Sequence, residues 1–198
     1  MAVLNIRKYP DPILRQKAVL VKDIDGELQR LIDDMIDTLY AAPGIGLAAP
    51  QVGRSIRLFV LDLSGREEGG YPLSVLINPE IIHTEDEIWV EEGCLSIPDI
   101  TEVVGRAGRV AIKGLDREGR EIIIEGEGTL ARVFQHEMDH INGKLFIDRL
   151  SSLKRNIIMR RLRKRIRSSG GLSRDEDTIH GDTGVRPSEL RGAKSVRR

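Results

Sequence analysis

Residues 136–140 read HEMDH, in which two histidines stand four positions apart and a glutamate follows the first. On a helix, His136 and His140 lie one turn apart on one side and can bind the same metal ion. Glu137 lies beside them, where a carboxylate can exchange protons with a water molecule. A single histidine on such a helix is usually a hydrogen-bonded core residue, but this spacing makes that interpretation poor. The pentad therefore predicts a hydrolytic metalloenzyme.

Two histidines leave such a site short of one protein ligand. Zinc peptidases with this pentad take the third ligand from downstream. Here Asp148 follows the helix too closely, and His180 lies in a polar tail. Upstream, Cys94 is the only cysteine and offers a thiolate. A lone cysteine is more often a small buried apolar residue, so this assignment depends on the missing third ligand.

Three segments have the apolar spacing of helices and would position these groups. The first is 26–42, with Asp25 as its N-cap and Pro43-Gly44 as its stop. The second, about 129–142, carries the pentad, and the third, about 152–167, is strongly basic.

Between the first two helices the pattern is typical of strands. Stretches rich in β-branched residues cover 56–61, 74–77, 88–90, 103–115 and 121–127, with a hairpin loop at 116–119. Strands cluster in mid-chain rather than alternating with helices. The expected fold is α+β: antiparallel sheets packed around a central metal-binding helix, with an N-terminal helix and a basic C-terminal helix.

Composition is that of a globular protein, with 198 residues, 40% hydrophobic and 31% charged. We expect a catalytic domain at 1–150, a basic helix at 151–168 and a disordered tail at 169–198. One cysteine excludes an intrachain disulfide, the start lacks a signal-peptide pattern, and no apolar run is long enough for a membrane span. These features predict a cytoplasmic protein that does not use a membrane.

The net charge of zero hides an asymmetry, because Lys154 to Arg167 contains eight basic residues and no acidic one. Such a helix is either a solvated surface element or a docking element for an anionic partner, such as nucleic acid or a membrane surface.

Three segments together resemble a known family. GIGLAAPQVG at 44–53, EEGCLSIP at 91–98 and QHEMDHINGKLF at 135–146 are similar, in order and spacing, to the signature segments of peptide deformylases. The resemblance spans roughly residues 1–150. It implies an enzyme that removes the formyl group from the N-terminal formylmethionine of new polypeptides and releases formate. The glycine-rich segment lacks the Lys-Ser/Thr of a phosphate-binding loop, which disfavours that alternative.

The resemblance also implies roles for individual residues. Cys94, His136 and His140 would bind the metal, and Glu137 would act as general base and then as general acid. The Gln51 side-chain amide and the Leu95 backbone N–H would stabilise the oxyanion. Gly46 would offer backbone hydrogen bonds to an extended peptide, and Ile45 would line the methionine pocket.

The family further implies one Fe²⁺ per chain, which Zn²⁺ or another divalent metal can replace. It also implies contact of the basic helix with ribosomal RNA near the exit tunnel. The protein is expected to be a monomer.

Two other functions fit part of the pattern. One is a metallopeptidase that cuts internal peptide bonds, and the other is a ribosome-associated binding protein with a structural metal site. A structural site normally has four protein ligands, and only three are evident.

Glu92 and Arg106 form either an ion pair that braces the Cys94 strand or a solvated surface pair. Arg132 and Thr129 receive no role.

Overall fold

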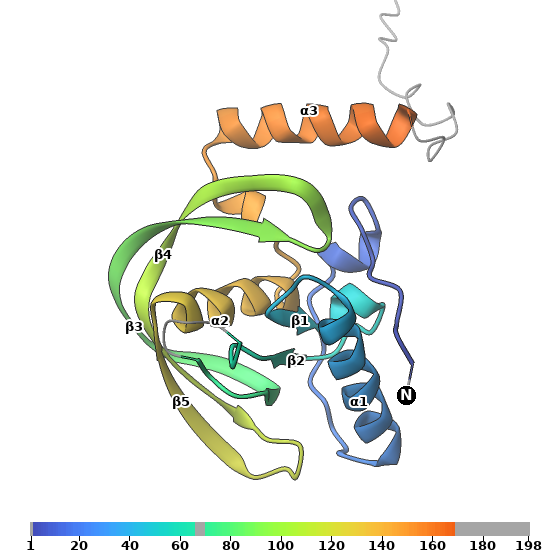
Figure 1. The fold of residues 1–198 in the computed structure, drawn as a ribbon, viewed down its shortest axis with the longest axis vertical. Helices are drawn as coiled ribbons and strands as arrows, with labels where there is room; N and C mark the ends of the chain where they lie inside the picture. Colours follow the sequence, from blue (N-terminus) through green and yellow to red (C-terminus); the bar gives the residue numbers. More distant parts are fainter. Residues whose placement is uncertain (1, 66–69, 169–198) are drawn as a thin grey trace, which may run out of the picture. The chain divides into compact units, whose positions relative to one another are not determined.

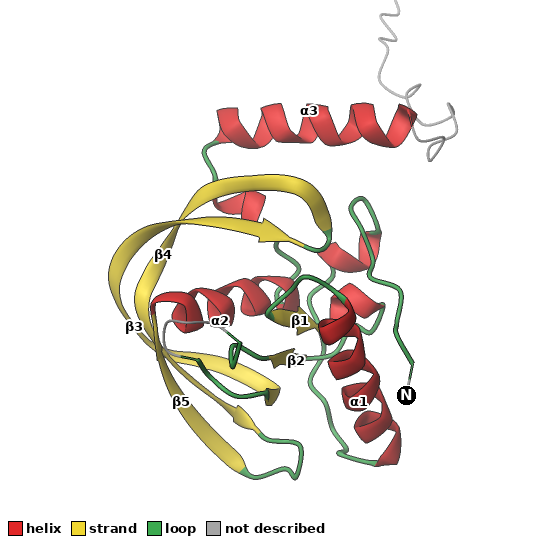
Figure 2. Cartoon of the chain, viewed as in Figure 1, coloured by secondary structure: helices red, strands yellow, loops and turns green. Residues whose placement is uncertain are grey.

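The helix that carries both histidines, α2 (Gly128–Ile141), lies inside a curved antiparallel sheet. The computed structural model describes residues 2–65 and 70–168. Its five strands are β1 (Gly46–Ala48), β2 (Leu58–Leu61), β3 (Ser74–Cys94), β4 (Ile97–Leu115) and β5 (Glu121–Glu127), and they follow this order across the sheet. Figures 1 and 2 show β3 and β4 bending around α2. The predicted α+β class is confirmed.

The predicted N-terminal helix is α1 (Gly26–Ala41). The Asp25 carboxylate accepts hydrogen bonds from the backbone N–H groups of Glu27 and Leu28, both at 2.9 Å, so the predicted N-cap is present. The apolar side of the helix packs against β2 and contributes Ile32 and Met35, which are fully buried, to one of two core clusters.

The second core cluster lies between α2 and the sheet. Phe134 and Ile141 of α2 are fully buried there against Phe59, Leu76 and Ile112 of the strands. Burying side chains of this size stabilises a fold by about 1.5–3 kcal/mol each. The cluster therefore holds the HEMDH pentad at a defined position against the sheet.

The strands β3 and β4 are much longer than the pattern predicted. The stretches predicted at 74–77 and 88–90 are the two ends of a single strand of 21 residues. Most side chains at 83–87 are polar and exposed, so the apolar pattern is lost between those ends. Pairing with β4 continues through this region, with register shifts after Ile77 and Ile81, because backbone hydrogen bonds do not require apolar side chains.

Three short 3-10 helices and the basic helix complete the described chain. The 3-10 helices cover Pro12–Arg15, Ala49–Val52 and Phe146–Arg149, and the basic helix is α3 (Ser152–Ser168). The chain divides into two units, with the boundary between Asn156 and Ile157. Across the described ranges, no helix combines the length and apolar character that a membrane crossing requires. The tail predicted to be disordered, 169–198, lies outside the described residues.

Candidate active site

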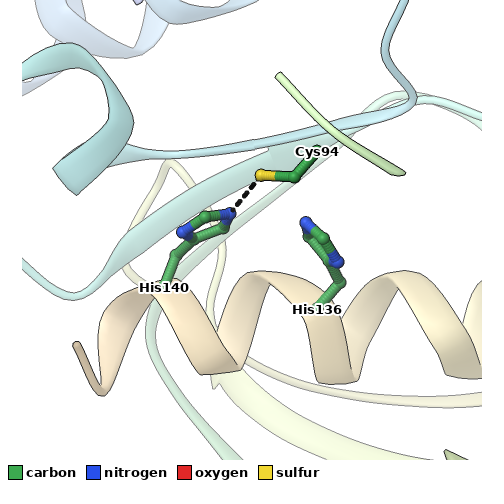
Figure 3. A group of neighbouring side chains, drawn as sticks. All are labelled: Cys94, His136 and His140. Atoms are coloured by element: carbon green, nitrogen blue, oxygen red, sulfur yellow. Dashed lines mark hydrogen bonds between the residues drawn. The ribbon is translucent and has the colours of Figure 1, made fainter. Parts of the chain in front are cut away.

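Three side chains that could bind a metal ion meet where the end of β3 approaches α2. One ligand atom from each of Cys94, His136 and His140 lies within 4.8 Å of the others (Figure 3). Cys94 Sγ is 3.2 Å from Nε2 of His140, and the two imidazole centroids are 5.0 Å apart. The sulfur comes from a strand 42 residues before the first histidine, so the sheet brings together a set that is separate in the sequence.

The surroundings of Cys94 favour its thiolate form. Burial alone would raise the pKa of the Cys94 thiol, but the two histidines lower it well below its ordinary value of 9.0. Burial would likewise lower the pKa of His136, yet Cys94 and Glu92 raise it well above 6.5. A thiolate is the form that binds a metal ion, so the surroundings prepare Cys94 as a ligand.

The donor atoms of this region fit a divalent metal. His136 Nδ1 lies 3.0 Å from Oε2 of Glu92, an arrangement that fixes the ring and leaves its Nε2 for ligation. Of the buried side-chain atoms in the described residues, Glu137 Oε2 and His140 Nδ1 have no hydrogen-bond partner. Two imidazoles and one thiolate form a donor set suited to zinc or iron rather than to magnesium or calcium.

Glu137 lies between the histidines and the first strand. Its side chain is buried, and burial raises its pKa to about 7 against the lowering effect of the two histidines. A Cβ atom placed on Gly46 would lie only 2.5 Å from Glu137 Oε1, so β1 approaches this carboxylate as closely as a glycine permits. The carboxylate is thereby held against the strand edge.

Gln51 has a fixed amide orientation. The backbone N–H of Ala48 donates to Gln51 Oε1 at 2.8 Å, which directs the NH₂ group toward Ser96 Oγ at 3.3 Å and Cys94 Sγ at 3.9 Å. Gln51 and Ser96 are both buried. Sequence reasoning singled out Gln51 but missed Ser96, which stands two residues after Cys94.

Behind the histidines lies a buried ionic network that was only partly anticipated. Arg106 donates to both carboxylate oxygens of Glu92, at 2.7 and 2.9 Å, and to Asp139 at 2.7 Å. The ion pair of Glu92 and Arg106 is thus buried, and the alternative of a solvated surface pair is wrong. The pKa of Glu92 falls to about 2, because Arg106 and His136 outweigh the effect of burial.

Asp139 is a further member of the network, and it received no role in the sequence analysis. It is buried and accepts two further hydrogen bonds from Arg149, at 2.7 and 2.6 Å. Burial would raise the pKa of Asp139, but Arg149 and Arg106 lower it. The only sequence feature that could have indicated a role for Asp139 is its position inside the HEMDH pentad.

A cavity of about 660 Å³ opens beside these groups. Ile45, Gly46, Gln51 and Leu95 line it together with Glu137 and two of the three potential metal ligands, Cys94 and His136. All the residues given a role from the sequence, except His140, therefore surround one space. Arg132 also lines it, whereas Thr129 does not.

Comparison with known proteins gives a consistent result. The family model described as polypeptide deformylase matches residues 3–156. A peptide deformylase of Thermodesulfovibrio yellowstonii is 55% identical over 163 residues, which cover 82% of this chain and 98% of that protein. A peptide deformylase of Syntrophobacter fumaroxidans is 52% identical over 169 residues, which cover 85% of this chain and 99% of that protein.

Solved structures agree with the sequence relatives. A peptide deformylase from Legionella pneumophila matches with a TM-score of 0.78 and 47% identity, covering 87% of this chain and 100% of that one. A peptide deformylase from Ehrlichia chaffeensis in complex with actinonin matches with a TM-score of 0.78 and 38% identity. The match covers 84% of this chain and 99% of that one.

Proposed function

The chain belongs to the peptide deformylase family, and we propose that it removes the N-formyl group from the N-terminal formylmethionine of newly made polypeptides. The observation that carries this proposal is the convergence of Cys94, His136 and His140 with the buried Glu137 carboxylate beside one cavity. These residues also suit a hydrolase that acts on an amide carbonyl.

Substrate binding is proposed at the free edge of β1. This strand ends the sheet, pairing with β2 on one side, and its first residue, Gly46, lines the cavity. An extended peptide can add to such an edge through backbone hydrogen bonds. Ile45 and the neighbouring apolar wall would receive the methionine side chain, and the formyl group would then lie toward Glu137.

The proposed reaction breaks the bond between the formyl carbon and the methionine nitrogen. A divalent metal held by Cys94, His136 and His140 would polarise the formyl oxygen and lower the pKa of water. Glu137 would take a proton from the attacking water and pass it to the leaving nitrogen, which gives formate and a free amine. The Gln51 amide and the Leu95 N–H would donate to the negative oxygen as it forms.

The test is formate release from formyl-Met-Ala-Ser by protein of known metal content. Glu137→Gln removes the base but keeps the side-chain shape, so turnover should fall by roughly 10²–10⁴-fold with metal still bound. The matched control is Glu125→Gln, an exposed glutamate on β5, which should leave turnover unchanged. Cleavage of unformylated Met-Ala-Ser at a similar rate would favour a general peptidase. No turnover by fully metallated protein would instead favour the binding-protein alternative.

Finer assignments belong to the same proposal. We propose Fe²⁺ as the resident metal, with Zn²⁺ able to replace it, a monomeric state and a cytoplasmic location. Residues 1–150 would form the catalytic domain, and the helix at 151–168 would contact ribosomal RNA through its basic residues. Unchanged co-sedimentation with ribosomes after truncation at Ser152 would refute the helix assignment.

A further inference from the structure

Ser96 is a buried polar residue to which the proposed reaction gives no part. Its exposed fraction is 0%, and its hydroxyl oxygen lies 3.3 Å from Nε2 of Gln51. Ser96 does not line the cavity beside the metal-binding cluster, so it is not placed to touch a substrate. A serine becomes a nucleophile when an adjacent base takes its proton, and the amide of Gln51 is not a base. Any effect of Ser96 on the reaction therefore passes through Gln51.

The amide of Gln51 has one oxygen and two N–H groups, and its orientation is fixed. The backbone N–H of Ala48, the last residue of β1, donates to Oε1 at 2.8 Å. A flipped amide would place its NH₂ group against this donor, so the oxygen stays where it is. On the other side, Nε2 donates to Ser96 Oγ, and the second acceptor within reach is Cys94 Sγ at 3.9 Å. Sulfur is a weak acceptor, so one N–H remains available to a stronger one.

The backbones of Gln51 and Ser96 are held by the same N-terminal segment. The N–H of Arg7 donates to the Gln51 carbonyl at 2.7 Å, and the N–H of Tyr9 donates to the Ser96 carbonyl at 2.9 Å. Gln51 lies in the 3-10 helix Ala49–Val52, whereas Ser96 follows 45 residues later, between β3 and β4. Two donors that are two residues apart thus keep these distant segments side by side. The contact between the amide and the hydroxyl therefore rests on a fixed backbone.

We propose that Ser96 is a positioning residue, which holds the Gln51 amide so that one N–H points to the negative oxygen formed in the reaction. This inference rests on the proposed function, because the oxyanion role of Gln51 is part of it. Ser96 occupies one donor and the Ala48 N–H occupies the oxygen, so the remaining N–H stays directed toward the metal-binding cluster. A charged oxygen there accepts a stronger hydrogen bond than the sulfur does. A donor that is already oriented needs no rearrangement as the charge develops.

The first test is the variant Ser96→Ala, which removes the acceptor and leaves one buried N–H of Gln51 without its partner. With formyl-Met-Ala-Ser, kcat should fall roughly 2- to 13-fold, as expected for one lost hydrogen bond. KM should not change, because Ser96 does not line the cavity. The matched control is Thr38→Val, which removes another buried hydroxyl, one that donates to Asp34 O at 2.6 Å outside the cavity. This control should keep the wild-type kcat.

A double-mutant cycle separates positioning from general structural damage. Gln51→Leu removes the amide donors and should lower kcat by about 10²–10³-fold, as for the loss of one oxyanion donor. In that background Ser96→Ala should have little further effect, because its action passes through the missing amide. A purely structural role of Ser96 would instead give the same fold loss with and without Gln51.

Hydrogen exchange of the Gln51 side-chain amide gives a readout that needs no turnover. In the zinc-loaded full chain with isotope-labelled glutamine, the Gln51 signals are identified by their loss in Gln51→Leu. Their exchange with solvent should be faster in Ser96→Ala than in the wild type, whereas Thr38→Val should match the wild type. Absent formate release by the wild type would count against the proposed function, and the exchange rates would still test the inference. Wild-type kcat in Ser96→Ala, equal losses in both Gln51 backgrounds, or unchanged amide exchange would overturn it.

Discussion

Replacement of Arg106 by methionine should strongly destabilise the protein. Methionine keeps much of the side-chain length but removes the positive charge and all the side-chain hydrogen-bond donors. Arg106 is 0% exposed, and its partners Glu92 and Asp139 are 1% and 4% exposed in their side chains. Without Arg106, Glu92 remains buried with only His136 as a partner, and Asp139 relies on Arg149 alone.

The expected loss of stability follows because the buried charges of Glu92 and Asp139 are then poorly compensated. Removing one partner of a buried ion pair costs about 3–5 kcal/mol, because the remaining charge is poorly compensated. For a chain of this length each kcal/mol lowers Tm by roughly 2–4 °C, so Tm should fall by roughly 6–20 °C. Glu92 would also hold the His136 ring less firmly, and metal affinity should fall by about 10–100-fold.

Urea unfolding and a metal-competition titration measure both effects. The control is Arg109→Met on the same strand, whose side chain is 56% exposed and whose loss should change stability by at most about 0.5 kcal/mol. Adding Glu92→Gln to Arg106→Met removes one uncompensated charge and should restore at least about 1 kcal/mol. A cost below about 1 kcal/mol for Arg106→Met, with metal affinity unchanged, would refute this account of the network.

Other predictions concern the strand edge, a surface hydrogen bond and the metal. Gly46→Ala should lower kcat/KM by about 100-fold because its Cβ would displace Glu137, whereas Gly26→Ala, with 3.6 Å to its nearest neighbour, should have no effect. Asp62→Asn should return the raised pKa of Tyr40 toward 10.0, because Tyr40 donates to Asp62 at 2.6 Å. In the wild type this bond stabilises the fold below pH 10 and is lost as pH rises through the higher folded pKa, so an ultraviolet titration should show the variant ionising first. Chelation should abolish turnover but leave the circular dichroism spectrum folded, because both core clusters are apolar and independent of the metal.

Part of the fold and part of the site could be predicted from local patterns. The apolar repeat and the Asp25 cap set α1 to within one residue of its observed end. The HEMDH spacing placed His136, Glu137 and His140 on the same side of a helix because helix geometry depends only on neighbours in the sequence. The three signature segments together indicated the family. The middle of β3 was not predicted, because its exposed polar side chains carry no periodic signal.

Only tertiary contacts decided which distant groups meet. Cys94 was a candidate ligand, and the bend of β3 against α2 brings its sulfur to 3.2 Å from His140. The choice between a buried and a solvated pair for Glu92 and Arg106 was settled by the packing of α2 over the sheet. The same packing buries Asp139, to which local patterns assigned no role. Helix periodicity is a short-range property of the chain, whereas burial and charge pairing depend on segments that only the complete fold brings together.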